Sequence, residues 1–480
     1  MNRSTRPSIA LGLSLLAGAV LLATPAHAAL YVYNCILNPR QEVPPVASSA
    51  LGGGRFVIDT DANTVTFRIA YAGLSSAELV AHIHGDAGSS PGTGGPVIFS
   101  LPAGNPKVGV WNYDEAQEPL ILGGLCYANI HSANFPGGEM RGQIVPFNAL
   151  LDAAQETPPT VSTGTGWAVA TIDLALKQLK YYVFFEGLTG AVTAGHFHGN
   201  SIIGTPAAVK VALAAPLTSP ISGTVTYLAA DETALLSGQW YVNLHTVANP
   251  GGEIRGQLVP RVIPIDADQE VLPSVSEPAS AGFSLVCVDT VANKLGYDER
   301  VLSLSSAETF AHIHGFAWTN ANAGVQLTEA LGARKLGTWT YPVANEADVL
   351  GGRSYFNVHT TNHPGGEMRG QIVDLPVSPG VLGVVDQPRH VSGLAAAPNP
   401  FGGRTQLTFQ LARTGRVSLR IVDVNGRSVR QLPDATYAPG AHSLEWDGHD
   451  DEGRAVSPGV YFAVVKTSEG EKITRVARLR

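Results

Sequence analysis

Apolar and polar residues alternate along much of this chain. The pattern is clear at residues 65–71 and again at residues 179–185, where the apolar positions are Val65, Phe67, Ile69 and Tyr71, then Leu179, Tyr181, Val183 and Phe185. A period of two places alternate side chains on one face of a β-strand. Turn signals such as Asp61-Ala62-Asn63 divide these strands into hairpins. The pattern therefore predicts an all-β protein.

The chain also repeats itself three times. A Gln-Glu pair recurs every 114 residues, at 41–42, 155–156 and 269–270. Each copy ends in a similar stretch: YANIHSANFPGGEMRGQI (127–144), YVNLHTVANPGGEIRGQL (241–258) and YFNVHTTNHPGGEMRGQI (355–372). A repeat of this length is a whole domain that buries its own core, not a solenoid unit. We expect three antiparallel β-sandwiches or Greek-key barrels, at residues 29–147, 148–262 and 263–376.

The last part of the chain has a different pattern. A connector rich in Pro, Gly and Val is expected at residues 377–396. After it, Leu407, Phe409 and Leu411 alternate with polar residues, and Asn425-Gly426 is a strong signal for a hairpin turn. Residues 397–480 are therefore expected to form a smaller, immunoglobulin-like β-sandwich.

The first residues have the features of a secretory signal. Arg3 and Arg6 precede an apolar run at about residues 9–23, and Ala26-His27-Ala28 offers small residues to a signal peptidase. We predict a signal peptide at residues 1–28; the alternative, an uncleaved anchor, is disfavoured because the run is short for a membrane span. No other apolar run is long enough, so no transmembrane segment is expected in the mature chain. The protein is predicted to be secreted or at the cell surface.

Charge and cysteine content narrow the function. A net charge of -8, with no cluster of Lys and Arg, excludes a general nucleic-acid binder. Only three cysteines are present, too few for a disulfide scaffold or a cysteine metal cluster. Cys35 and Cys126 both lie in the first repeat, and a disulfide between them is expected.

Histidines recur at matching positions in every copy. Each repeat has a His-x-His pair with an apolar residue between, and a third histidine 45 to 47 residues further on: His82, His84 and His131; His196, His198 and His245; His312, His314 and His359. On a strand, the paired histidines share the face turned away from the core. If the third histidine lies on a neighbouring strand, three imidazoles converge as ligands for copper or zinc.

Further polar residues accompany the histidines. They have second-shell or partner-binding roles in our interpretation, and the glutamates are candidates for a fourth ligand or for holding a histidine nitrogen: Asn129, Glu139, Arg141, Asn243, Glu253, Arg255, Asn357, Glu367 and Arg369. The same residues are also compatible with a hydrogen-bond network that braces the hairpins or binds a partner, with no metal. No nucleophile elbow, phosphate loop or dinucleotide motif is present, so we predict no enzyme and no catalytic residue.

The repeats resemble a known family. The opening Gln41-Glu42-Val43-Pro44, the Ala-His-Ile-His-Gly stretch from Ala81, and Asn-x-His followed by Pro-Gly-Gly-Glu-x-Arg-Gly-Gln resemble the CHRD domain, first described in chordin and widespread in bacterial secreted proteins. The resemblance covers about residues 32 to 375, and it implies an extracellular β domain. The third copy departs slightly, with Leu272-Pro273 in its opening segment and an additional His363.

Two further resemblances bear on function. Ala397-Pro398-Asn399-Pro400-Phe401, the Val424-Asn425-Gly426-Arg427 turn and Trp446-Asp447-Gly448 resemble FlgD Ig-like and type IX secretion sorting domains. That resemblance implies export or attachment at the bacterial outer membrane, with its export machinery as a partner. The His-x-His strand is also similar to the copper-binding strand of copper/zinc superoxide dismutase, although no bridging histidine or separate zinc cluster is evident here.

Two functional hypotheses follow from these patterns. In the first, the chain is a non-enzymatic binding or adhesion protein whose polar β faces bind an extracellular protein or matrix. In the second, it is a metalloprotein with a three-histidine copper or zinc site in each repeat, redox-active and similar to superoxide dismutase.

Overall fold

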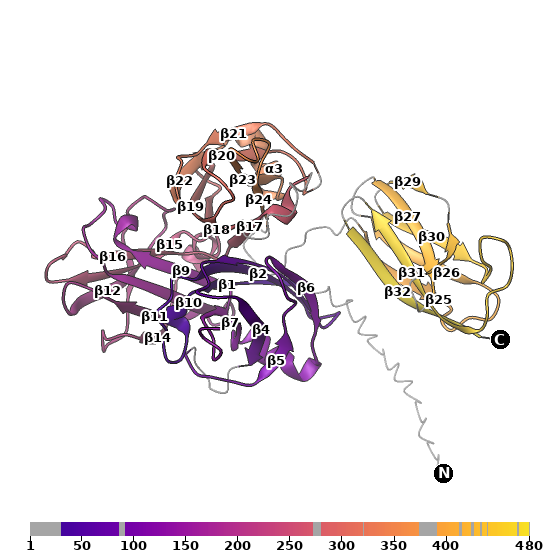
Figure 1. Cartoon of the computed structure of the whole chain (residues 1–480), viewed down its shortest axis with the longest axis horizontal. Helices are drawn as coiled ribbons and strands as arrows, with labels where there is room; N and C mark the ends of the chain where they lie inside the picture. The colour runs from indigo at the N-terminus through magenta and orange to yellow at the C-terminus, as the bar shows by residue number, and fades with distance from the viewer. Residues whose placement is uncertain are drawn as a thin grey trace, which may run out of the picture.

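The computed structural model describes residues 30–85, 92–271, 280–319, 321–373, 391–411, 415–423, 427–432, 434–438, 440–467 and 470–479. The predicted signal peptide and residues 377–390 of the expected connector lie outside this part. Among the described residues nearly all regular structure is β-strand, with three α-helices of five residues each, so the predicted fold class is confirmed (Figure 1). Within the same part, no helix is long and apolar enough to cross a membrane.

The three repeats share one topology of eight strands. The first repeat forms two sheets, ordered β5-β4-β7-β8 and β1-β2-β3-β6, and an isolated bridge between Asn38 and Arg141 connects them. Its elements are β1 (Leu30–Leu37), β2 (Leu51–Asp59), β3 (Thr64–Ala72), β4 (Glu78–Gly85), β5 (Val97–Ser100), β6 (Lys107–Asn112), α1 (Glu118–Leu122), β7 (Cys126–Ser132) and β8 (Met140–Ile144).

The second and third repeats follow the same order as single sheets of eight strands. The second consists of β9 (Phe147–Asp152), β10 (Thr165–Asp173), β11 (Gln178–Glu186), β12 (Val192–Gly199), β13 (Val209–Ala212), β14 (Ile221–Thr226), α2 (Glu232–Leu236), β15 (Trp240–Thr246) and β16 (Ile254–Leu258). The third consists of β17 (Val262–Asp266), β18 (Ala281–Asp289), β19 (Lys294–Ser303), β20 (Glu308–Gly315), β21 (Val325–Thr328), β22 (Arg334–Thr340), α3 (Glu346–Leu350), β23 (Ser354–Thr360) and β24 (Met368–Ile372).

Each barrel buries its own apolar core, as the period-two pattern requires. In β3, Val65, Phe67, Ile69 and Tyr71 are all buried, whereas Thr66 between them is exposed. Asn63 makes the turn before this strand with a positive φ of 51°, a conformation that asparagine tolerates better than most residues. Local sequence therefore fixes both the strand and its buried face.

The C-terminal domain is a β-sandwich of two main sheets, ordered β25-β26-β30 and β28-β27-β31-β32, with β29 paired to β27. Its strands are β25 (Val391–Ala397), β26 (Thr405–Leu411), β27 (Gly415–Val422), β28 (Ser428–Gln431), β29 (Ala435–Tyr437), β30 (Gly440–Trp446), β31 (Gly459–Thr467) and β32 (Gly470–Arg478). Trp446 and Phe401 anchor its core. Strand β25 begins at Val391, inside the stretch expected to be a connector, and the predicted Asn425-Gly426 turn includes residues outside the described part.

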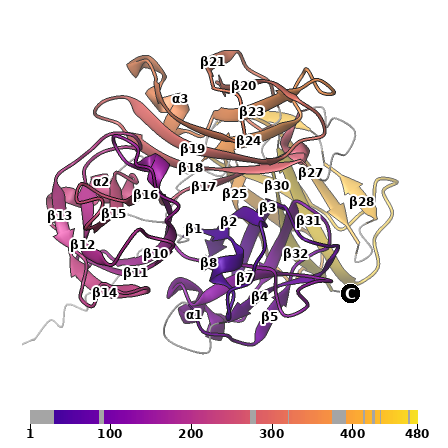
Figure 2. The same ribbon diagram turned by 60° about the vertical axis from the view of Figure 1, so that its left-hand side comes forward.

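The three barrels pack around a common centre, which the sequence did not predict (Figure 2). The first strands β1, β9 and β17 meet there. The Asn34 side chain donates to the Pro260 carbonyl (2.8 Å) and accepts from the Val262 amide (3.2 Å), while the Asn148 side chain donates to the Asn34 carbonyl (3.0 Å). An apolar cluster drawn from all three repeats surrounds these bonds, with Ile36, Ile202, Val262, Phe283 and Leu285 among its members.

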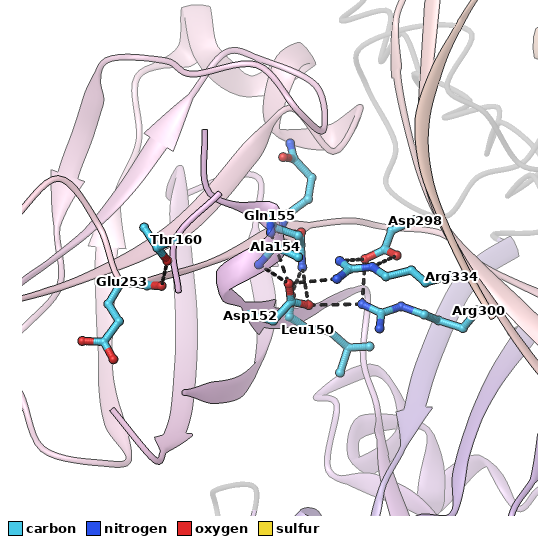
Figure 3. Close-up of polar contacts among 10 residues, drawn as sticks. Leu150, Asp152, Ala154, Gln155, Thr160, Glu253, Asp298, Arg300 and Arg334 are labelled. Carbon is cyan, nitrogen blue, oxygen red and sulfur yellow. Dashed lines mark hydrogen bonds and ion pairs between the residues drawn. The ribbon is translucent and has the colours of Figure 1, made fainter. Parts of the chain in front are cut away.

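Ion pairs also connect the repeats. Between the second and third repeats, Asp152 lies 3.0 Å from Arg334 and 3.2 Å from Arg300 (Figure 3). Burial opposes ionisation of Asp152, but the two guanidinium groups outweigh it and lower the pKa of its carboxyl group. Between the first and third repeats, Arg68 pairs with the buried Asp266 at 2.6 Å. The three repeats therefore form one closed unit.

The expected disulfide is wrong. Neither Cys35 nor Cys126 forms a disulfide, and both side chains are buried in the core of the first repeat. Cys35 lies in β1, which pairs with β2, whereas Cys126 begins β7, which pairs with β4 and β8. Both act as small apolar side chains, and burial raises the pKa of the Cys35 thiol.

Candidate metal centres

In each repeat the His-x-His strand lies beside the strand of the third histidine. In the first repeat β4 pairs with β7, so that His82 is opposite Asn129, His84 is opposite Tyr127, and Val80 is opposite His131. Ile83, between the two histidines, is fully buried in the core. Since alternate residues face opposite ways, the histidines lie on the outer face of the barrel. Strands β12 and β15, and β20 and β23, repeat this register.

The structure brings the three imidazoles of each repeat together. Nδ1 of His82 lies 3.4 Å from Nε2 of His131, and Nδ1 of His196 lies 3.2 Å from Nε2 of His245. In all three repeats, one nitrogen from each of the three histidines falls within 4.8 Å of the others. Nitrogens bound to one metal at about 2.0–2.1 Å in tetrahedral geometry are separated by about 3.3 Å. The triads therefore have the dimensions of a metal-binding shell.

Backbone carbonyls select the tautomer of two histidines in each triad. Nδ1 of the second histidine lies 2.9 Å from a carbonyl oxygen, that of Gly95, Ala207 or Ala323. Nδ1 of the third histidine lies 3.0–3.1 Å from the carbonyl of Pro136, Pro250 or Pro364. A carbonyl can only accept, so Nδ1 carries the hydrogen and Nε2 presents a lone pair. This is the second-shell arrangement that orients metal-binding histidines.

Several of these Nε2 atoms are buried without a partner. Within the described residues, Nε2 of His84, His198, His314 and His359 makes no hydrogen bond. Such groups normally find a partner, and each exception requires an explanation. The atoms face the shared space of their triads, where a cation would satisfy them.

The histidines are also held in the neutral form that binds metal. Burial lowers the pKa of His84 and His198 below the ordinary 6.5, and the neighbouring imidazoles and the Arg141 or Arg255 guanidinium lower it further, against the carbonyl hydrogen bond. In the third repeat, burial lowers the pKa of His314 for the same reasons. Each of these imidazoles is therefore uncharged at neutral pH.

A stack of three side chains supports each site, and sequence reasoning missed its middle member. In the first repeat His84 stacks on Tyr127, with ring centroids 4.8 Å apart and planes 4° apart, and the Arg141 guanidinium lies 3.5 Å from the other side of the tyrosine ring. The other repeats contain the same stacks, His198–Tyr241–Arg255 and His314–Tyr355–Arg369. The sequence signal that could have revealed this tyrosine is its recurrence two residues before the Asn of each Asn-x-His stretch.

The recurring Gln-Glu pair also belongs to this face. Asn129 donates to the Glu42 carboxyl group (2.7 Å), and Asn243 and Asn357 bind Glu156 and Glu270 in the same way. Burial raises the pKa of Glu42 to about 7, although Asn129 and Arg141 oppose the shift. Gly138 packs against this carboxyl group: at its φ of 131°, an added Cβ would lie 2.8 Å from the Glu42 oxygens. That close approach explains the Gly-Gly turn.

The structure does not place the glutamate of the Pro-Gly-Gly-Glu turn among the clustered histidine nitrogens. The buried Glu253 carboxylate accepts hydrogen bonds from Ser162, from the amide and hydroxyl of Thr189, and from Thr246, at 2.5–2.7 Å. Glu139 and Glu367 have corresponding hydroxyl and amide donors. These glutamates directly precede the strands β8, β16 and β24, and their carboxylates brace the neighbouring loops. The Nδ1 atoms of the second and third histidines are held by backbone carbonyls and not by these carboxylates.

Comparison with known proteins identifies the class of these repeats. The CHRD domain family matches residues 33–144, 147–258 and 262–372, and the FlgD Ig-like domain matches residues 396–471. The chain therefore belongs to the CHRD family.

Individual relatives are more distant. Chordin of Danio rerio is 30% identical over 233 residues, which cover 44% of this chain and 24% of that protein. FlgD from Xanthomonas campestris is 27% identical, covering 18% of this chain and 67% of that chain, with a TM-score of 0.14. Latent PorU from Porphyromonas gingivalis is 10% identical, covering 94% of this chain and 34% of that chain, with a TM-score of 0.17. Neither solved structure is similar enough to extend the account of the fold.

Proposed function

We propose that this chain is an extracellular metal-binding protein with one three-histidine copper site in each CHRD repeat. The observation that supports it best is the convergence, three times over, of imidazole nitrogens whose tautomers are set by backbone carbonyls. In each triad the second and third histidines present Nε2, and the first presents Nδ1. Among divalent first-row metals, copper binds such nitrogen sites most tightly, which favours it over zinc.

A hydrogen-bonded cluster of neutral imidazoles explains the geometry less well. One such bond accounts for the contact between the first and third histidines in repeats 1 and 2. In the third repeat, however, Nδ1 of His312 and Nε2 of His359 are both buried and have no hydrogen bond to any described residue. The second histidine has an unsatisfied Nε2 in every repeat. A metal ion satisfies all these atoms together.

A binding role fits the site better than a catalytic one. The Asn, Arg, Gln and Glu side chains around each triad bond to one another or to the backbone, which positions the histidines. Three similar sites on one chain suit the buffering or carriage of copper outside the cell.

Elemental analysis tests the proposal. The untagged chain, stripped with chelator and then reconstituted with copper, is expected to retain about three equivalents after desalting. His198→Gln is expected to retain two, and the triple variant H84Q/H198Q/H314Q none. His449→Gln in the C-terminal domain is the matched control, because that histidine is partly exposed and bonds to Asp447. Equal copper in the triple variant and the control would refute the sites.

A second candidate is a protein partner that docks on the same face. Exposed apolar residues border the triads: Phe310 is 58% exposed and its ring stacks on His312, and Val80 is 47% exposed and lies opposite His131. Distant similarity to chordin supports an extracellular protein as the partner. Binding of such a partner that survives removal of the metal, but not Phe310→Ser, would favour this role.

The C-terminal domain is proposed to direct export or display at the bacterial outer membrane. The match to the FlgD Ig-like domain supports a separate folded module there, and the type IX sorting role stays a prediction. Deletion of residues 397–480 is expected to abolish surface display in the native host while copper binding persists. Normal display of the truncated chain would reject the idea.

A further inference from the structure

Two positions in the barrel interior are apolar in the first two repeats and acidic in the third. In the first two repeats they belong to the apolar cores, and in the third they are carboxylic acids: Ile69, Val183 and Glu299 at one position, and Leu101, Leu213 and Glu329 at the other. Both glutamates are buried, at 0% and 5% exposure. Burying a carboxyl group in a core is costly, so this replacement requires a reason.

A lysine lies among these acids. Lys335 on β22 is directly opposite Glu299 on β19, and its Nζ lies 3.8 Å from the Glu299 carboxyl and 2.8 Å from that of Glu308 on β20. Its one hydrogen bond within the described residues is to the Gly332 carbonyl, at 2.7 Å. The side chains of Lys335 and Glu299 are almost completely buried, and that of Glu308 is 9% exposed. An amine and a carboxyl group are thus in contact in an almost completely buried site.

Glu299 has the properties of an uncharged acid. Neither of its oxygens makes a hydrogen bond within the described residues. Burial raises the pKa of its carboxyl group, Glu308 raises it further, and Lys335 opposes both. Burial also raises the pKa of Glu329, as does the nearby Glu299. One ammonium cannot neutralise three ionised carboxylates in such a place, so at least one acid keeps its proton.

The equivalent positions in the other repeats lack part of this arrangement. In the first repeat Lys107 meets Glu78 at 2.6 Å, but the Lys107 Nζ also donates to the Pro102 and Gly104 carbonyls, so all three of its hydrogens are engaged. Ile69 and Leu101 stand there in place of Glu299 and Glu329, so both additional acids are missing. In the second repeat the corresponding residues are Val192 and Ile221, which cannot react.

We propose that Lys335 and Glu308 form an isopeptide bond, with Glu299 as the catalytic acid. Proton transfer within the ion pair gives a neutral amine and a neutral carboxyl group. The Nζ lone pair attacks Cδ of Glu308, and Glu299 gives its proton to the departing hydroxyl, which leaves as water. The proton lost by nitrogen returns to Glu299. One C–N bond forms, one C–O bond breaks, and no oxidant or reductant is needed.

The fold favours the reaction because it holds the amine and the carboxyl group in contact, so that no intermolecular encounter is needed. The bond would also have a clear structural consequence. Strands β21 and β22 are the two ends of the eight-stranded order, and β20 is the neighbour of β21. A covalent link from β20 to β22 would close the barrel across its seam, in a chain whose described cysteines form no disulfide.

Intact mass measurement of the full folded chain tests the proposal. The wild-type chain is expected to be lighter than its sequence by one water, and digestion should yield a branched peptide in which Lys335 is joined to Glu308. Lys335→Arg should have its full sequence mass. A folded wild-type chain at full mass, or a missing water that maps elsewhere, would overturn the proposal.

Two variants separate the role of the acids from folding. The double variant E299I/E329L installs the residues that the first repeat has at these positions, so it should fold and keep the full mass. Glu299→Gln keeps the size of the side chain but cannot donate an acid proton, and it should also remain unlinked. A bond that forms normally in both variants, or a bond between Lys107 and Glu78, would contradict the part assigned to Glu299.

Discussion

The three repeats match one another closely on their outer faces and less closely in their barrel interiors. On the outer face, the His–Tyr–Arg stacks, the Asn–Glu pairs and the carbonyls that hold the imidazoles recur with nearly the same geometry. In the barrel interior, one position changes from Ile69 to Val183 to Glu299. Packing tolerates such exchange where volume and polarity are compensated, whereas a ligand shell does not. The outer face therefore keeps one geometry in all three repeats, whereas the interior of the third repeat contains acids that the other two lack.

The largest effect is expected at the seam of the third repeat. Glu299→Gln, which keeps the ion pair of Lys335 and Glu308, should prevent the cross-link between residues 308 and 335. Because the link restricts the unfolded chain, its loss is expected to lower the free energy of opening by about 3 kcal/mol. Amide hydrogen exchange in β20 and β22 measures this free energy of opening. An unchanged exchange rate in the variant would mean that no cross-link distinguishes the third repeat from the other two.

The next effect concerns the loops behind the histidine face. Glu253→Gln replaces a buried carboxylate that accepts four hydrogen bonds, and it is expected to cost about 2–3 kcal/mol. Hydrogen bonding lowers the pKa of Glu253 from 4.5 to about 2 against the effect of burial. A lowered pKa means that its contribution is complete above pH 4.5 and is lost as the pH falls toward 2.

Urea unfolding at pH 7 and pH 3 measures that contribution. The difference in the free energy of unfolding between wild type and Glu253→Gln should be smaller at pH 3 than at pH 7. The matched control Glu452→Gln changes an exposed residue, so it should differ little from wild type at either pH. A constant difference would mean that Glu253 is not ionised in the folded protein.

A smaller effect is expected from the stack beneath the ligands. Arg255→Lys keeps the charge but loses the planar group that lies 3.4 Å from the Tyr241 ring. Since that ring supports His198, copper affinity in the second repeat should fall about tenfold, or about 1.4 kcal/mol. Competitive titration should show two unaltered sites and one weaker site; equal weakening of all three would argue against independent sites.

Copper affinity should depend on pH in the same way in all three repeats. Burial lowers the pKa of His84, His198 and His314 below 6.5, so protons compete with the metal only below that pH. Copper affinity is expected to change little from pH 8 to 7 and to begin to fall only below pH 6.5. A loss of affinity that begins above pH 7 would contradict ligation by imidazoles with lowered pKa values.

Much of this arrangement could be predicted from local pattern. Alternation in β3 identified the buried face, and His82-Ile83-His84 identified the outer one, because a strand gives each residue a side by parity. The His–x–His spacing does not reveal ring tautomers, which depend on the Gly95 and Pro136 carbonyls contributed by loops. The expected Cys35–Cys126 bridge failed because residue counts cannot show that β1 and β7 are not paired. The central packing around Asn34 depends on contacts between whole barrels, which no local pattern encodes.

The most direct test of the copper sites is anomalous X-ray diffraction at the copper edge from crystals of the reconstituted chain. The account predicts three peaks, one in each CHRD repeat, each bonded to Nδ1 of the first histidine and Nε2 of the second and third. Copper bound elsewhere, or triads whose imidazoles stay hydrogen-bonded to one another in copper-saturated crystals, would contradict it.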